Sequence, residues 1–267
     1  MDADARSRAA RALSEAYETG KPIDPLIEAN PEMTLEDSYA IQLEQIERRL
    51  AAGATIKGHK VGLTSAVMQR QMNVNQPDFG HLLDDMFYLE NSTIAASTFL
   101  QPRIEPEVAF VLKRPLRGPG VTVAEAAAAV DFVLPALELI DSRIRDWKIS
   151  FFDTVADNAS SAGVVLGSTP VGVQDVDLRR SGCVLRRNGE VVGTGAGGAV
   201  LGSPITSLAW LANTLGARGV TLEAGHVVLP GSITASVAVT PGDTFSATFA
   251  GIGSVTVRFA PDPTGGQ

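Results

Sequence analysis

The segment Arg103-Ile-Glu-Pro-Glu-Val-Ala-Phe-Val-Leu112 decides the fold, because it sets two glutamates in a run of residues that favour a buried strand. Side chains two residues apart on a strand project from the same face, so Glu105 and Glu107 would lie side by side. A third glutamate, Glu138, lies in a second apolar run at 132–140. Burying a lone carboxylate is costly or shifts its pKa, so three of them need a partner. The pattern predicts a site for a divalent cation.

The ligand chemistry narrows the choice of cation. Carboxylate oxygens suit Mg²⁺, Mn²⁺ or Ca²⁺, whereas zinc and copper sites rely on His and Cys. No two of the three histidines and one cysteine are at ligand spacing: His59, His81, His226 and Cys183. Three protein oxygens leave about half of an octahedral shell open, which indicates a catalytic rather than a structural cation. The alternative is that Glu105 and Glu107 pair with Arg103 or Arg114 at a strand edge.

Composition restricts the classes of partner. A formal net charge of -8 and a pI of about 4.9 argue against nucleic acid or an anionic membrane, which would repel the chain. The first residues contain no apolar signal core, and no run reaches the roughly 18 apolar residues of a membrane span. The single cysteine excludes an intrachain disulfide, and the cytoplasm is the expected compartment.

The pattern predicts an α+β fold with three regions: a helical N-terminal region at 1–55, a strand-rich domain at 56–260 and a tail at 261–267. Thr34 is expected to cap a helix, and Arg187-Asn-Gly-Glu190 to form a hairpin turn. The glycine-rich run 193–198 lacks the features of a phosphate loop and is interpreted as a flexible turn or closely packed backbone. Strands are expected at 56–63, 92–97, 227–229, 233–239, 244–250 and 254–259, and helices at 4–19, after Thr34, at 65–72, after Thr122 and at 203–216.

Six segments carry a family resemblance through their order: Lys60-Val-Gly-Leu-Thr64, Gln76-Pro-Asp-Phe-Gly80, Pro102-Arg-Ile-Glu-Pro-Glu107, Leu134-Pro-Ala-Leu-Glu138, Asp141-Ser-Arg-Ile-Arg-Asp-Trp147 and Val155-Ala-Asp-Asn-Ala-Ser160. Together they resemble the bacterial 2-hydroxypenta-2,4-dienoate hydratases and the related 2-oxo-3-hexenedioate (4-oxalocrotonate) decarboxylases of the fumarylacetoacetate hydrolase superfamily. The resemblance runs nearly end to end. It implies a rolled β-sandwich core, and Mg²⁺ or Mn²⁺ held by Glu105, Glu107 and Glu138.

The resemblance also implies a reaction on a small 2-oxo acid or dienol carboxylate. The expected activity is the addition of water to 2-hydroxypenta-2,4-dienoate, in the meta-cleavage catabolism of aromatic compounds, to give 4-hydroxy-2-oxopentanoate. Similarity assigns Lys60 to general acid/base work, with a pKa lowered by the cation and by burial. The alternative for Lys60 is a solvated surface lysine. Asp78 is the second acid/base candidate, with a turn after Pro77 as its alternative.

Substrate binding is expected at Leu63, Asp157, Asn158 and Ser161, and the last three have a turn-capping alternative. Arg143 and Arg145 are interpreted as surface residues paired with Asp141 or Asp146, and the alternative is that they neutralise the substrate or acidic groups. His59 is expected on the face of its strand opposite Lys60 and outside the catalytic set.

Alternative functions are a decarboxylase and a non-catalytic, metal-bound partner subunit. A hexenedioate decarboxylase needs cationic groups for the second carboxylate of its substrate, and the segment Arg143–Lys148 looks more like that of hydratases. The family resemblance implies that the chain forms a homo-oligomer and associates with a neighbouring enzyme of the same pathway.

Overall fold

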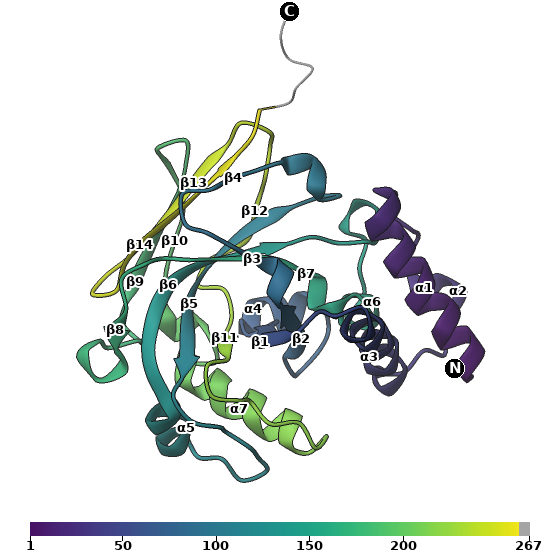
Figure 1. Ribbon diagram of the computed structural model, residues 1–267, viewed down its shortest axis with the longest axis horizontal. Coiled ribbons are helices and arrows are strands. Elements are labelled where there is room, and N and C mark those ends of the chain that lie inside the picture. Colours follow the sequence, from purple (N-terminus) through teal and green to yellow (C-terminus); the bar gives the residue numbers. More distant parts are fainter. Residues whose placement is uncertain (262–267) are drawn as a thin grey trace, which may run out of the picture.

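The N-terminal region consists of three helices, which lie together on one side of the molecule in the computed structural model (Figure 1). The structure describes residues 1–261, so all of the predicted tail except Pro261 lies outside it. Helix α1 (Ala3–Thr19) begins at Asp2, whose side chain accepts a hydrogen bond from Ala5 N. Helix α3 (Leu35–Ala51) begins with the predicted cap at Thr34, in a reciprocal capping box with Asp37. The segment between them contains a one-turn helix, α2 (Leu26–Ala29).

The rest of the chain forms two sheets, which confirms the predicted α+β fold with a rolled β-sandwich core. The larger sheet has the order β2-β1-β11-β5-β6-β7-β3, with β12 on β5 and β8 on β6. The smaller has the order β10-β9-β13-β14-β4. The strands of the larger sheet are β1 (Ile56–Gly62), β2 (Asp78–Leu83), β3 (Phe87–Tyr88), β5 (Arg103–Leu112), β6 (Val130–Ile140), β7 (Ser161–Leu166), β8 (Val171–Gly172), β11 (Val227–Leu229) and β12 (Val237–Ala238).

A single apolar core joins the two sheets. Phe110 of β5 and Phe245 of β13 are both fully buried in it, and β13 and β14 contact β6 directly. The strands of the smaller sheet are β4 (Thr93–Ile94), β9 (Gly182–Arg187), β10 (Glu190–Ala196), β13 (Thr244–Phe249) and β14 (Gly253–Phe259). The remaining helices are α4 (Ala66–Gln71), α5 (Val123–Ala129), α6 (Phe151–Ala156) and α7 (Pro204–Gly216). Among the described residues, no helix combines the length and apolar character needed to cross a membrane.

Two predicted strands are much shorter than expected. Only Thr93–Ile94 of the segment 92–97 is a strand, and a 3₁₀ turn follows it. Of 233–239, only Val237–Ala238 pairs with β5 in a ladder. Ile233 N donates a single bond to Pro106 O, and Thr234 Oγ1 bonds to the backbone of the next residue. The hydroxyl therefore competes with strand pairing, which the apolar alternation did not reveal.

The glycine-rich run forms closely packed backbone, as one of its two interpretations predicted. It continues β10 into a 3₁₀ turn. A Cβ added to Gly195 would collide with the carbonyl oxygen of Ile233, and one on Gly197 with that of Leu178. The hairpin turn at Asn188-Gly189 is also confirmed, with positive φ angles of 54° and 88°.

The three histidines of the chain lie together behind the β1–β2 pair. Because side chains alternate, His59 and His81 share the face opposite Lys60, as predicted for His59, and their ring centroids are 4.9 Å apart. The ring of His226 lies 6.1 Å from that of His59. His81 Nδ1 contacts Gln42 Oε1 at 3.1 Å, whereas neither ring nitrogen of His59 has a hydrogen-bond partner among the described residues.

This histidine cluster predicts destabilisation in mild acid. Burial lowers the pKa of His81 to about 4 and that of His59 well below its usual value. At these two histidines the unfolded state therefore binds more protons than the folded state below about pH 6.5, so their contribution to stability falls as the pH falls towards 4. Each of the two histidines is expected to remove unfolding free energy on the order of 1 kcal/mol per pH unit in that range.

Urea unfolding at pH 8, 6 and 5 measures this effect. His59→Leu replaces a ring that makes no hydrogen bond within residues 1–261, so the variant should fold and should lose less stability than the wild type between pH 8 and pH 5. Equal slopes in the two proteins would contradict the assignment to His59.

Candidate active site

The three predicted glutamates lie together on one face of the larger sheet. Strands β5 and β6 are antiparallel in a register that sets Glu105 directly opposite Glu138, and Glu107 follows on the same face. One carboxylate oxygen from each lies within 4.8 Å of the others. Glu107 and Glu138 are buried, and Glu105 is partly exposed. Among residues 1–261 neither Glu105 nor Glu107 forms an ion pair with Arg103 or Arg114, so the strand-edge alternative is wrong.

The electrostatics of this glutamate cluster favour a cation. Burial, with the charge of Glu138, raises the pKa of Glu105 to about 7, and burial and both neighbours raise that of Glu107 well above its usual value. Within the described chain, Glu107 Oε1 and Glu138 Oε2 lack a hydrogen-bond partner, and the donor near Glu138 Oε1 is the Lys60 ammonium, 3.2 Å away. Buried acceptors without donors are rare in proteins. Three hard oxygen donors in this state fit a hard divalent cation such as Mg²⁺ or Mn²⁺.

Lys60 lies against the glutamate cluster. Its Nζ is 3.2 Å from Glu138 Oε1 and donates a 3.0 Å hydrogen bond to Ala159 O. The side chain is only 4% exposed, so the surface-lysine alternative is wrong. Burial acts to lower its pKa, but the charges of Glu138 and Asp78 outweigh burial, and the pKa is raised above its usual value. The expected lowering therefore does not arise from the protein alone, because four carboxylates surround the ammonium group.

Asp78 faces the same space from β2. It pairs with Gly62, two residues along β1 from Lys60, and both acid/base candidates lie on one face of the β1–β2 pair. Asp78 is the first residue of a strand, so the turn interpretation is wrong. Its Oδ1 is buried without a partner in the described chain, burial raises its pKa, and Lys60 opposes that shift. A Cβ on Gly62 would collide with this carboxylate.

Asp157 and Asn158 use their side chains within the protein. Asp157 accepts hydrogen bonds from Arg143 Nε and from Arg143 N. Asn158 Oδ1 accepts from His81 N at 2.8 Å, and its Nδ2 donates to His81 O at 2.9 Å. The surface-pairing interpretation is wrong for Arg143, which is buried, whereas Arg145 is exposed as predicted but pairs with Asp24 instead of Asp141 or Asp146. A substrate-binding role for Asp157 and Asn158 stays a prediction, and the contacts seen hold the segment that reaches Lys60.

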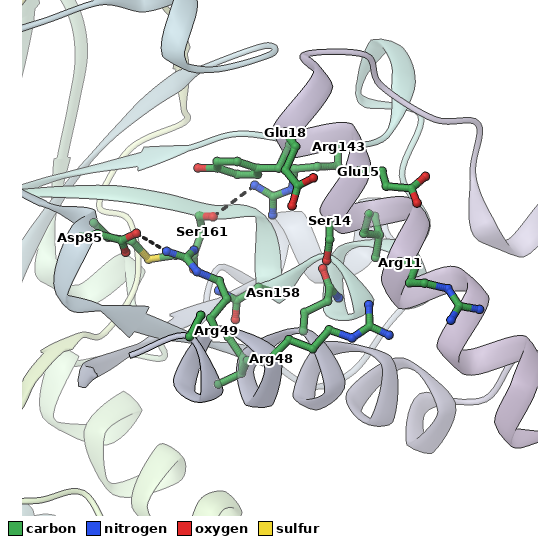
Figure 2. Close-up of a pocket in the computed structure, with 16 residues that line it drawn as sticks. Arg11, Ser14, Glu15, Glu18, Arg48, Arg49, Asp85, Arg143, Asn158 and Ser161 are labelled. Atoms are coloured by element: carbon green, nitrogen blue, oxygen red, sulfur yellow. Dashed lines mark hydrogen bonds and ion pairs between the residues drawn. The ribbon is translucent and has the colours of Figure 1, made fainter. Parts of the chain in front are cut away.

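The last two predicted substrate-binding residues are Ser161, the first residue of β7, and Leu63, which follows β1. Figure 2 shows Ser161, Asn158 and Arg143 beside a cavity of about 610 Å³ between α1 and α3, with Arg143 Nη1 donating to Ser161 O. The hydroxyl of Ser161 is buried and has no partner within residues 1–261. Leu63 follows the last residue of β1 with a positive φ of 54°, and its carbonyl accepts from Gln69 Nε2 of α4. Their substrate contacts also stay predictions.

Two residues that the sequence analysis did not select support the cluster. Gly231 N donates a 2.7 Å hydrogen bond to Glu107 Oε2, and its φ of 130° is one that favours glycine. Ala159 presents its carbonyl to Lys60 from a left-handed turn in which Asn158, Ala159 and Ser160 have φ angles of 51°, 52° and 56°. The Pro-Gly dipeptide is a signal for the first turn, and Asn158, a residue type that tolerates the left-handed region, is a signal for the second.

The left-handed turn predicts opposite outcomes for two substitutions of Ala159. Non-glycine residues pay about 1–3 kcal/mol for this conformation. Ala159→Gly adopts it freely and should keep the carbonyl in place, with turnover close to that of the wild type. Ala159→Val is β-branched and should open the turn, so kcat should fall about tenfold or more because Lys60 loses its position.

Steady-state kinetics and Mn²⁺ titration of both variants check this, with circular dichroism to confirm folding. The metal dissociation constant should stay at the wild-type value in each. A folded valine variant with full kcat would rule out the positioning role.

Comparison with known proteins agrees with this geometry. The family model described as Fumarylacetoacetate (FAA) hydrolase C-terminal matches residues 55–260. The 2-keto-4-pentenoate hydratase of Paraburkholderia xenovorans (strain LB400) is 46% identical over 266 residues, covering 100% of this chain and 99% of that protein. The 4-oxalocrotonate decarboxylase of Pseudomonas putida is 45% identical over 229 residues, covering 86% of this chain and 87% of that protein.

A solved structure is similar to this chain in fold as well as in sequence. The 4-oxalocrotonate decarboxylase from Pseudomonas putida G7, complexed with magnesium and adipate, has a TM-score of 0.94 and 40% identity, covering 97% of this chain and 98% of that one. Sequence and structure therefore agree over nearly the whole length, and the chain belongs to the fumarylacetoacetate hydrolase family.

Proposed function

We propose that this protein is a divalent-metal-dependent hydratase that converts 2-hydroxypenta-2,4-dienoate to 4-hydroxy-2-oxopentanoate. The observation that carries the proposal is the position of Lys60 Nζ, 3.2 Å from Glu138 Oε1 beside the three-glutamate cluster. The likeness to the hydratase of Paraburkholderia xenovorans supports this choice of reaction. Glu105, Glu107 and Glu138 would hold Mg²⁺ or Mn²⁺, which would supply Lewis-acid stabilisation of the substrate's carboxylate and C2 oxygen.

The residues of the chain account for the proton movements. The reaction removes the C2 hydroxyl proton of the dienol and places a proton on C5, which gives the 2-oxo-3-enoate. Water then adds with its oxygen on C4 and a proton on C3. Lys60 is a proton donor in its charged form, and Asp78 is an adjacent acceptor with a raised pKa and an oxygen free of hydrogen bonds within residues 1–261. Two groups with opposed roles on one strand pair suit a reaction that both removes and adds protons.

The test follows the ultraviolet absorbance of freshly generated 2-hydroxypenta-2,4-dienoate after chelator treatment of the protein, with and without added Mg²⁺. The expected result is metal-dependent loss of absorbance and a product heavier by one water. No turnover with metal present would overturn the hydratase assignment.

The second candidate is a 2-oxo-3-hexenedioate decarboxylase. The TM-score of 0.94 to the Pseudomonas putida G7 decarboxylase favours keeping it. The two reactions differ in product mass, because a decarboxylase releases CO₂ whereas a hydratase adds water. Incubation with 2-oxo-3-hexenedioate and mass analysis of the product therefore distinguishes them.

The proposed function also includes an oligomeric state, a cellular compartment and a partner enzyme. We infer a homo-oligomer that acts in the cytoplasm and associates with a neighbouring enzyme of the same pathway, which follows the sequence resemblance. Size-exclusion chromatography with light scattering measures the subunit number, and a monomer at all concentrations would contradict it.

A further inference from the structure

We propose that Arg143 is a positioning residue for Lys60, because its guanidinium group bonds both ends of the left-handed turn whose Ala159 carbonyl receives the Lys60 ammonium. The inference rests on the proposed function, in which Lys60 moves protons beside the glutamate cluster. It gives the buried Arg143 an effect on the reaction that passes through the backbone of residues 157–161.

The guanidinium group of Arg143 bonds to the backbone on both sides of the turn. Its Nη2 donates a 2.5 Å hydrogen bond to Asp157 O, and its Nη1 donates a 3.2 Å bond to Ser161 O (Figure 2). Asp157 directly precedes and Ser161 directly follows the turn at 158–160. Nε and the backbone N of Arg143 also donate to the two carboxylate oxygens of Asp157. In the described part of the chain, Arg143 is the one side chain that bonds to both of these backbone carbonyls.

The turn needs this support because its backbone is strained. Asn158, Ala159 and Ser160 follow one another with positive φ angles, and none of them is glycine. Non-glycine residues hold this conformation only where the surrounding structure imposes it. The side chain of Asn158 ties the beginning of the turn to β2, and Asp141 N holds its last residue through Ser160 O. These bonds hold one end each, whereas the planar guanidinium fork of Arg143 fixes the two ends relative to each other.

The middle residue of the turn contacts the proton donor. Ala159 O accepts a 3.0 Å hydrogen bond from Lys60 Nζ, whose other contact is Glu138 Oε1 at 3.2 Å. Glu138 is also an expected metal ligand, so the Ala159 carbonyl is the contact of Lys60 for which no metal ion competes. A displacement of about 1 Å in a catalytic group can lower the rate about 100-fold. The position of the Ala159 carbonyl therefore determines how well Lys60 transfers a proton.

The surroundings of Arg143 keep its side chain ordered and leave room beside it. Arg143 is buried, and its guanidinium carbon lies 5.1 Å from the centre of the Tyr17 ring. A lysine ammonium is a point charge whose donors all leave one atom, so lysine at this position keeps the charge beside Asp157 but cannot reach both backbone carbonyls. Arg143 also lines the cavity of about 610 Å³ between α1 and α3 (Figure 2). A free guanidinium ion can therefore enter the space left by a shortened side chain.

The test compares Arg143→Ala and Arg143→Lys in the dienoate assay at saturating Mg²⁺. Both variants are expected to lose kcat about tenfold or more, with little change in KM or in the Mn²⁺ dissociation constant, because the metal ligands stay in place. Guanidinium chloride at about 20 mM, well below the molar range that unfolds proteins, should restore most of the lost kcat to Arg143→Ala, whereas equal sodium chloride should not. It should restore none to Arg143→Lys, whose own side chain fills the space. Arg145→Ala, at an exposed position that pairs with Asp24, is the matched control and should behave as the wild type in both salts.

A second readout needs neither substrate nor metal. Acetic anhydride labels amino groups, and mass analysis of the peptides gives the labelling rate of Lys60 relative to the exposed Lys57 of the same strand. Lys60 should react slowly in the wild type, where its ammonium is buried and bonded, and several-fold faster in both Arg143 variants. Guanidinium should slow the reaction again in Arg143→Ala only.

A folded Arg143→Lys protein with wild-type kcat and wild-type labelling of Lys60 would overturn the proposal, since a positive charge beside Asp157 would then be sufficient. Guanidinium that raises the melting temperature of Arg143→Ala and changes neither kcat nor the labelling rate would assign Arg143 a purely structural role. If Arg143→Ala does not fold, Arg143→Lys decides by the same two readouts, because it keeps a charge beside Asp157. A wild-type protein without dienoate turnover would refute the proposed function, and the labelling rates would still decide whether Arg143 positions Lys60.

Discussion

The Lys60→Met protein is expected to lose hydratase turnover by about two to four orders of magnitude, the contribution of a positioned acid/base group, and to keep its metal affinity. Methionine fills most of the volume of the lysine chain, so the buried space beside Glu138 stays packed, while the proton donor is removed. Removing a positive charge 3.2 Å from Glu138 cannot weaken a cation site by repulsion. The Mn²⁺ dissociation constant should therefore stay the same or fall.

The matched control is Lys57→Met, which changes an exposed lysine of the same strand. It should retain wild-type kcat and metal affinity. Absorbance assays at saturating Mg²⁺ give kcat. Titration with Mn²⁺, followed by electron paramagnetic resonance, gives the dissociation constant of the metal. A Lys60→Met protein with full turnover would exclude Lys60 from the chemistry, and one with lost metal affinity would assign it to the metal site instead.

The alternation of side chains along a strand was enough to predict that the glutamates lie together. Glu105 and Glu107 were placed on one face because alternation along a strand is a local rule, and Glu138 was added because its apolar surroundings demanded a partner. Helix starts at Thr34 and Thr122 follow from capping boxes that span four residues, which need no knowledge of the tertiary fold. The family resemblance then supplied Lys60 and Asp78, whose spacing alone carried no chemical signal.

The parts that could not be predicted depend on contacts between distant segments. Asn158 and His81 are 77 positions apart, and Lys60 and Ala159 are 99 apart, so no local pattern relates them. The same register that joins β1 to β2 brings His59 against His81, although their spacing in the chain resembles no ligand motif. The sequence predicts substrate contacts or turn-capping for Asp157, Asn158 and Ser161, and it leaves the choice open because it shows their polar groups but not which of them the protein already uses.

The Glu107→Gln protein is expected to show opposite changes with and without metal. Without metal, Glu107 is buried among carboxylates and its pKa is raised well above the usual value, so its ionised form is unfavourable. Glutamine removes that charge and keeps an oxygen to accept from Gly231 N, so the melting temperature of the metal-free protein should rise. With metal, a ligand is lost, and affinity for Mn²⁺ should fall at least by the factor of about 100 seen for the strongest outer-shell partners.

Differential scanning calorimetry in chelator and in saturating Mg²⁺ separates these two effects. The wild type should gain stability from Mg²⁺, because a ligand that binds only the folded state raises the free energy of unfolding, and Glu107→Gln should gain little. Glu47→Gln, at an exposed position on α3, should shift neither transition. A metal-free Glu107→Gln protein less stable than the wild type would mean that Glu107 contributes favourably to folding through its charge. In that case the cluster would be a structural network, since a site built to receive a cation holds its carboxylates at a cost that only the cation relieves.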